Sequence, residues 1–281
     1  MTKLNPLLPA VFMALSLLSS CKKAYDYIED HPNTYPPCRI TNYRMIFSDG
    51  SQNDFVVTYN QQGNPISLKD SIRANVATTD QYFRYDKLNR LSDYMICYVP
   101  AVGAIEWHKY VYPRPDYIID TVMFYDTGLV TEPSPIAANT TEYRISAYTL
   151  DHFDRIAKVW SIPNDSPHTP SLQSTIVYDA NGNLPLPFAP PGEFVPSLGY
   201  DNKVNMFRTN KVWQFVYQDY SANNIIVQDS SSSLRYNDFG LPLNLIDLTV
   251  YLIFPFQEYN PGGPEAIVDY ACSFPKGPVD Y

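Results

Sequence analysis

The chain has 281 residues, of which 45% are hydrophobic, so it can build one large β domain or two small domains with a true core. Its formal net charge is −9, and its Lys and Arg residues form no basic block. Because phosphate binding depends on clustered Lys and Arg, these totals argue against nucleic acid or anionic lipid head groups as ligands. The 24 Tyr and 25 Pro, with only 11 Gly, favour strands and turns over helices.

The N-terminus carries the features of an export signal followed by a lipid attachment site. Residues 1–3 are positively charged, residues 4–18 are mostly apolar, and Leu18-Ser19-Ser20-Cys21 resembles the lipobox of bacterial lipoproteins. The alternatives are a transmembrane helix, for which the segment is short and contains two prolines, an ordinary signal peptide, and a buried core helix. We expect residues 1–20 to be removed and Cys21 to carry the lipid.

Residues 21–37 are expected to form a tether between the lipid and the domain. Their apolar residues recur with neither the period of 2 of a strand nor the period of 3.6 of a helix, and the segment ends in prolines. Lys22 takes the place of the Asp that, directly after the Cys, would resemble an inner-membrane retention signal. These features predict a lipid-anchored protein of the cell envelope, located at the outer membrane. They do not distinguish between its two leaflets. Residues 38–281 contain no long polar linker and are expected to form a single β domain.

One short pattern recurs along the chain: Tyr, Asp or Asn, two free positions, a turn former, Asn or Arg, and an aliphatic residue or Pro. Its copies begin at Tyr59, Tyr85, Leu150, Tyr178 and Tyr236. We interpret each copy as a β-hairpin turn that the Asp or Asn side chain caps. Gly63, Gly182 and Gly240 are then expected to have positive φ. Asn89 and Asp154 stand at the same position and tolerate the same conformation.

The fold class that these hairpins predict is all-β, with serial antiparallel β-hairpins forming one strongly curved or barrel-like sheet. No stretch after the leader keeps a 3.6 period for longer than about ten residues, so no long helix is expected. Residues 212–217 are interpreted as a strand, which places Trp213, Phe215 and Tyr217 on one face by the period of two. Such a face is more often packed core than a platform for sugars.

The repeated pattern resembles the YD repeat of Rhs-like proteins, whose core is Tyr-Asp-x-x-Gly-Arg-Leu. Residues 38–272 are also similar to uncharacterised Gram-negative lipoproteins with YD-like repeats. The similarity lies in a Cys near the first strand, the run Tyr200–Asn205 and the ending Tyr270-Ala271-Cys272. That family is described as a domain of unknown function with a porin-like, all-β fold. The resemblance implies a fold and carries no activity.

Three cysteines remain once Cys21 is lipidated. If one disulfide forms in an oxidising compartment, we expect it to join Cys38 to Cys272 and to leave Cys97 free. The alternative is that all three are reduced and buried as small apolar residues.

We expect no catalytic, cofactor-binding or metal site. The four His contain no i, i+4 pair, and the four Cys contain no closely spaced pair, so the spacing of a zinc site is missing. The sequence has neither a Gly-x-Ser-x-Gly elbow nor a Gly-rich phosphate loop. A dispersed triad or two distant carboxylates would leave no such motif, so an enzyme stays open as an alternative.

The function we expect is that of a membrane-anchored cell-envelope lipoprotein with a binding or structural role, without enzymatic activity. A glycan-capturing surface accessory protein is the first alternative, and an envelope hydrolase with a dispersed active site is the second. The lipid on Cys21 makes the membrane a partner. The acidic chain favours a neutral glycan or another envelope protein as the ligand and disfavours nucleic acid.

Overall fold

The computed structural model describes residues 36–47, 50–72, 78–99, 104–126, 140–164, 169–185, 198–227, 234–246 and 265–273. The predicted signal peptide, the lipidation site at Cys21 and most of the tether lie outside the described residues. Within those ranges, no helix is long and apolar enough to cross a membrane.

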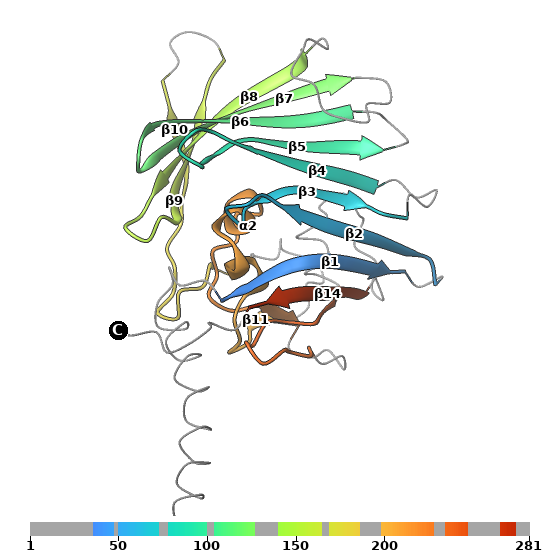
Figure 1. Cartoon of the computed structure of the whole chain (residues 1–281). Coiled ribbons are helices and arrows are strands. Elements are labelled where there is room, and N and C mark those ends of the chain that lie inside the picture. The colour runs from blue at the N-terminus through green and yellow to red at the C-terminus, as the bar shows by residue number, and fades with distance from the viewer. Residues whose placement is uncertain are drawn as a thin grey trace, which may run out of the picture.

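Twelve strands form one antiparallel sheet (Figure 1). Ten of them follow one another as serial hairpins: β1 (Cys38–Ile46), β2 (Gln52–Tyr59), β3 (Pro65–Asp70), β4 (Thr78–Tyr85), β5 (Leu91–Val99), β6 (Ala104–Arg114), β7 (Tyr117–Asp126), β8 (Thr140–Leu150), β9 (Ile156–Ile162) and β10 (Ser171–Thr175). The sheet is completed beyond β1 by β14 (Glu265–Cys272) and then β13 (Asn244–Ile246). The prediction of an all-β fold built from serial antiparallel hairpins is therefore confirmed.

The chain between β10 and β13 forms smaller elements. Strands β11 (Leu198–Tyr200) and β12 (Ile225–Val227) pair with each other as a separate two-stranded sheet. Between them lie the 3-10 helix η1 (Met206–Thr209) and the short helix α2 (Lys211–Val216). Figure 1 shows α2 against the large sheet, near the ends of β2 and β3.

The large sheet is open, so the expectation of a strongly curved or barrel-like sheet is wrong. Its strand order begins at β10 and ends at β13, and among the described strands these two edges pair only with β9 and β14. Closure is not needed to bury the inner face, because the segment holding η1 and α2 packs there. Both edge strands are short, which limits the unpaired backbone that an open sheet exposes.

One face of the sheet carries the main hydrophobic core. Alternate positions of neighbouring strands point into it, including Tyr43, Phe55, Leu68 and Phe83, all nearly inaccessible to solvent. Helix α2 adds Trp213, which is fully buried and meets the Phe83 ring edge-on at 5.3 Å between ring centres. The core therefore joins the hairpin sheet to a segment that follows it by many residues in the chain.

The aromatic run at residues 212–217 is mostly helical, so its interpretation as a strand is wrong. Asn210 caps the helix, because its side chain accepts a hydrogen bond from the backbone N–H of Val212 (2.9 Å). Tyr217 follows directly after the helix. A short helix packed on several sides shows an almost continuous apolar run, which the period of two cannot distinguish from a strand.

Cys38 and Cys272 lie opposite each other in the register of β1 and β14 and form a disulfide. The bond joins the first and last strands across 234 residues of sequence, so it restricts the unfolded chain strongly. Cys97 is a free, buried thiol, and burial raises its pKa to about 12. This thiol is therefore protonated and unreactive in the folded protein.

Candidate functional site

The five predicted turns share one pattern of hydrogen bonds. In the first, the N–H of Gly63 donates to the carbonyl of Asn60 (3.0 Å), and the N–H of Asn60 donates to the carbonyl of Asn64 (2.9 Å). The same two bonds recur in the turns that contain Asp86, Asp151, Asp179 and Asn237. In those four turns the Asp or Asn side chain also accepts two backbone N–H groups. The turns are thus held together by contacts within six residues of sequence.

The turn-former position is left-handed in every one of the five turns. Gly63, Gly182 and Gly240 have φ values of 83°, 82° and 72°. Asn89 and Asp154 have φ values of 60° and 58° at the equivalent position. Glycine has no steric penalty in this region, and Asn and Asp are the residues that enter it most readily after glycine.

Tyrosine hydroxyls connect several of the turns to an earlier segment of the chain. Four tyrosine hydroxyls each donate a hydrogen bond of 2.6 to 3.0 Å to a backbone carbonyl: Tyr59 to Ile40, Tyr85 to Pro65, Tyr112 to Leu91 and Tyr178 to Ile156. Three of these acceptors, Pro65, Leu91 and Ile156, are the last residues of the seven-residue repeat units that begin at Tyr59, Tyr85 and Leu150. We call these four bonds the tyrosine junctions. Burial raises the pKa of all four phenols, so they remain protonated donors.

An arginine stacks on the tyrosine at three of the four junctions. Arg39 lies over the ring of Tyr59 (5.4 Å), Arg90 over Tyr112 (4.4 Å) and Arg155 over Tyr178 (3.7 Å). Each arginine directly precedes the carbonyl acceptor in sequence. Two of the guanidinium groups are also neutralised within their own turns, Arg90 by Asp86 (2.7 Å) and Arg155 by Asp151 (2.8 Å).

Leu150 interrupts the series of junctions between Tyr112 and Tyr178. It occupies the first position of its turn, where the neighbouring turns have Tyr, and its side chain has no hydroxyl to donate. The preceding unit, Tyr112–Ile118, is also irregular, because two prolines replace the capping Asp and one of the free positions. The sequence pattern identified the Leu, but nothing in it indicated what lies opposite.

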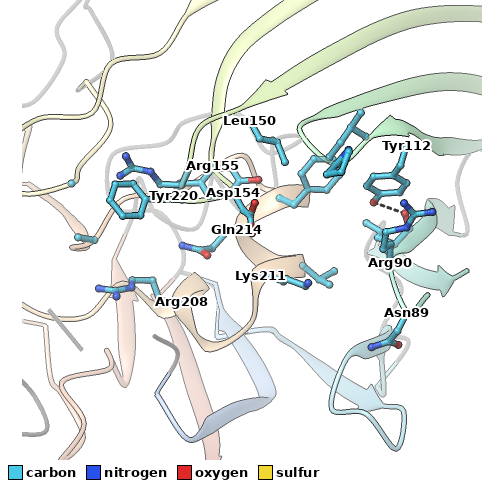
Figure 2. A pocket seen from close by; sticks show the side chains of 18 residues that line it. Asn89, Arg90, Tyr112, Leu150, Asp154, Arg155, Arg208, Lys211, Gln214 and Tyr220 are labelled. Carbon is cyan, nitrogen blue, oxygen red and sulfur yellow. Dashed lines mark hydrogen bonds between the residues drawn. The ribbon is translucent and has the colours of Figure 1, made fainter. Parts of the chain in front are cut away.

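A cavity of about 530 Å³ opens beside Leu150 (Figure 2). One wall comes from the turn ends of the hairpins and the other from η1, α2 and the residues that follow them. The lining residues are Asn89, Arg90, Leu91, Tyr112, Pro115, Ile118, Leu150, Phe153, Asp154, Arg155, Gly182, Arg208, Lys211, Val212, Gln214, Phe215, Tyr220 and Ala222. Ten of them are apolar or aromatic and seven are polar or charged, so the cavity offers both kinds of surface to a small molecule.

The lining of the cavity holds more cationic than acidic side chains, although the protein as a whole is acidic. Its lining holds one carboxylate, Asp154, and four cationic side chains, Arg90, Arg155, Arg208 and Lys211. Asp86 and Asp151 are not part of the lining, but they form ion pairs with Arg90 and Arg155. With Asp154, three carboxylates therefore accompany the four cationic side chains. Among these residues one positive charge remains in excess.

A second charged cluster lies on the same face of the sheet, where His108 bridges two carboxylates. Its Nδ1 is 2.9 Å from Asp120 Oδ2, and its Nε2 is 3.3 Å from Glu106 Oε1. Burial lowers the pKa of His108, but the hydrogen bonds to Asp120 and Glu106 outweigh it and raise the pKa to about 9. His108 is therefore a cation at neutral pH, and the cluster is an ion network rather than a base with a nucleophile. Sequence spacing did not reveal it, because Asp120 comes from the next strand.

No group of three or more His, Cys, Asp or Glu side chains that could hold a metal ion occurs in the part of the chain that the structure describes. No protein-family model matches the chain, and no curated protein matches it. The resemblance to lipoproteins with YD-like repeats therefore stays a prediction, and function has to be inferred from the cavity itself.

Proposed function

We propose that this chain is a lipid-anchored binding protein of the cell envelope and that its ligand occupies the cavity between the hairpin turns and α2. The observation that carries the proposal is the replacement of a junction tyrosine by Leu150 at the wall of this cavity. At the neighbouring junctions a phenol stands at the equivalent position, and its hydroxyl bonds to the carbonyl of an earlier residue. The leucine side chain is smaller than that of tyrosine and leaves space beside residue 150. This space is lined by a mixture of apolar and charged side chains.

Binding is favoured over hydrolysis by the state of the charged groups. Asp86 and Asp151 at the edge of the cavity are held by guanidinium groups, and Glu106 and Asp120 are bridged by protonated His108. Carboxylates already engaged in such ion pairs are not presented to a substrate as a free pair of acid and base. These arrangements suit a rigid receptor better than an envelope hydrolase with a dispersed site.

The proposed location rests on the N-terminal sequence and is supported by the disulfide. Bonds such as that between Cys38 and Cys272 persist in oxidising compartments, where a lipobox at Cys21 would also deliver the chain. Anchoring at the outer membrane and membership of the lipoproteins with YD-like repeats are parts of the same proposal. The lipid would hold the β domain near the membrane surface, and the cavity would present the binding site.

The test compares ligands that co-purify with two variants of the full chain, each extracted from envelopes in a nonionic detergent. Leu150→Tyr introduces the junction residue that the other turns contain and should narrow the cavity without preventing folding. Leu172→Tyr makes the same change on the exposed edge strand β10, where the leucine is 49% exposed. Mass spectrometry of the bound small molecules should find a compound in wild type and Leu172→Tyr that is depleted in Leu150→Tyr. An identical set in all three proteins would contradict the proposal.

A further inference from the structure

We infer that the end of the large sheet that carries the repeat turns docks on a zwitterionic lipid bilayer through apolar residues at the turn tips. The inference rests on the lipid anchor proposed above. Every neighbouring pair of strands from β1 to β9 is antiparallel, so the odd-numbered strands all begin at one end of the sheet. Figure 1 shows β1, β3, β5 and β7 running in the same direction. The turns directly precede β3, β5, β7 and β9, and Cys38 begins β1, so the chain enters the domain at this turn end.

The proposed anchor keeps the turn end near the membrane. Residues 22–37 separate Cys21 from Cys38. A flexible chain of that length spans roughly 20–25 Å on average. A strand of 11 residues such as β6 is about 37 Å long. Because the first distance is the shorter one, the lipid favours contact of the membrane with the turn end over contact with the opposite end of the sheet.

Three consecutive turns carry an apolar residue at the tip. Leu88, Pro115 and Phe153 all occupy the fourth position of their seven-residue units, and we call them the apolar tips. Leu88 is 72% exposed, Pro115 is exposed and Phe153 is half-buried. The turns on either side of these three have Gln62 and Asn181 at the same position. Turns usually carry Gly, Pro or small polar residues, so exposed Leu and Phe side chains on adjacent turns indicate a contact surface.

The apolar tips are arranged along one line. Successive hairpins of a sheet lie two strands apart, about 10 Å, so the three tips extend over roughly 20 Å of the turn end. The second and third turns are joined directly, because the N–H of Leu150 donates to the carbonyl of Asp116 (2.9 Å). A residue with a basic side chain precedes each tip: Lys87, Arg114 and His152. Such a side chain can stay among the lipid phosphates while the apolar tip enters the acyl region.

The ion pairs of these turns favour a zwitterionic surface over an anionic one. In each turn an arginine pairs with an aspartate over 2.7 to 3.2 Å: Arg90 with Asp86, Arg114 with Asp116 and Arg155 with Asp151. Because each guanidinium has a carboxylate beside it, attraction to anionic head groups contributes little, and apolar contact supplies the affinity. Pro115 and Phe153 also line the cavity, so docking would place the cavity against the lipid surface.

The test measures which end of the sheet contacts lipid when the full acylated chain is held in dioleoylphosphatidylcholine vesicles. The fluorophore NBD is attached at Leu88→Cys or, as the matched control, at Ile72→Cys. Ile72 is 46% exposed and follows β3 at the opposite end of the sheet. Cys97 is buried and Cys38 and Cys272 are bonded, so the new thiol is the one that reacts. A phospholipid with a nitroxide on its acyl chain should quench NBD several-fold more strongly at residue 88, because a docked tip lies about 5–10 Å inside the head-group boundary.

A second variant tests whether the apolar tips supply the contact. Phe153→Asn places at this tip the residue type that Asn181 provides in another turn, so the turn should still form. Loss of the ring should lower the ratio of docked to undocked protein about fivefold and weaken the quenching at residue 88. Leu172→Asn removes a side chain that is 49% exposed on β10 and should leave the quenching unchanged.

The intact mass of the protein separates failure of this inference from failure of the proposed anchor. Equal quenching at residues 72 and 88, in a protein whose mass includes the lipid, would overturn docking and leave the anchor in place. A mass without the lipid would overturn both. Fluorescence at residue 88 that shifts to the blue without quenching by the nitroxide would show that a second copy of the chain covers the tips, and docking would again be wrong. Unchanged quenching in Phe153→Asn would refute the role of the apolar tips.

Discussion

Replacing Gly182 with valine should destabilise the protein through the backbone of one turn. Gly182 has a φ of 82°, and an L-residue in the left-handed region costs about 1–2 kcal/mol, with a β-branched side chain at the upper end. Space is not the limiting factor. A Cβ atom added here would lie 3.6 Å from the Cβ of Ala222, which is an ordinary contact. For a chain of this size each kcal/mol lowers the melting temperature by roughly 2–4 °C.

Thermal unfolding of the full chain, followed by circular dichroism with the disulfide intact, measures this cost. The matched control is Gly182→Asn, because Asn89 already adopts a φ of 60° at the equivalent position of another turn. The valine variant should melt several degrees below wild type, and the asparagine variant should lie close to it. If valine melts with wild type, or if asparagine costs as much as valine, the turn is not held by left-handed geometry.

Three further outcomes are expected. Cys21→Ser should abolish incorporation of a clickable fatty acid and should retain residues 1–20; equal labelling of variant and wild type would exclude lipidation at this residue. Tyr178→Phe should lower the free energy of unfolding by about 1 kcal/mol in urea melts, because the carbonyl of Ile156 loses its donor, whereas the exposed Tyr143→Phe should cost little. The pKa of His108 is raised by folding from 6.5 to about 9, so its contribution to stability is complete below pH 6.5 and declines as the pH rises through 9. Wild type should therefore lose more stability than His108→Gln between pH 6 and 10, and parallel pH profiles would show that the ion network does not stabilise the fold.

The turns could be predicted from the sequence because they are local structures. Every bond that defines the turn at Asp151, for example, lies within the five residues from Asp151 to Arg155. The capping side chain and the left-handed position occur at fixed spacing, so the pattern in the sequence is the physical cause of the turn. Serial turns of this kind, with strand-forming residues between them, are also sufficient to predict an antiparallel sheet.

Closure of the sheet and the aromatic helix could not be predicted in this way. Whether β10 meets β13 depends on what covers the inner face, and that is settled by packing between distant segments. The helix at residues 211–216 has a local signal in its cap, Asn210. The same side chain also donates to the carbonyl of Gly63 (3.1 Å), a contact between residues far apart in the chain. Burial on several sides explains the apolar pattern that resembles a strand.

The candidate site shows the same division most clearly. Leu150 can be identified from the sequence alone, because it occupies a position where the other turns have tyrosine. That it lines the same cavity as Arg208 and Lys211 is a consequence of how the folded chain packs. The absence of a phenol at residue 150 can be seen in the local sequence. The opposite wall of the cavity comes from a segment more than fifty residues later, which is held in place by burial of Trp213 and its neighbours. The mixture of charged side chains around the cavity likewise depends on which residues the fold brings together, so the composition of the whole chain does not predict it.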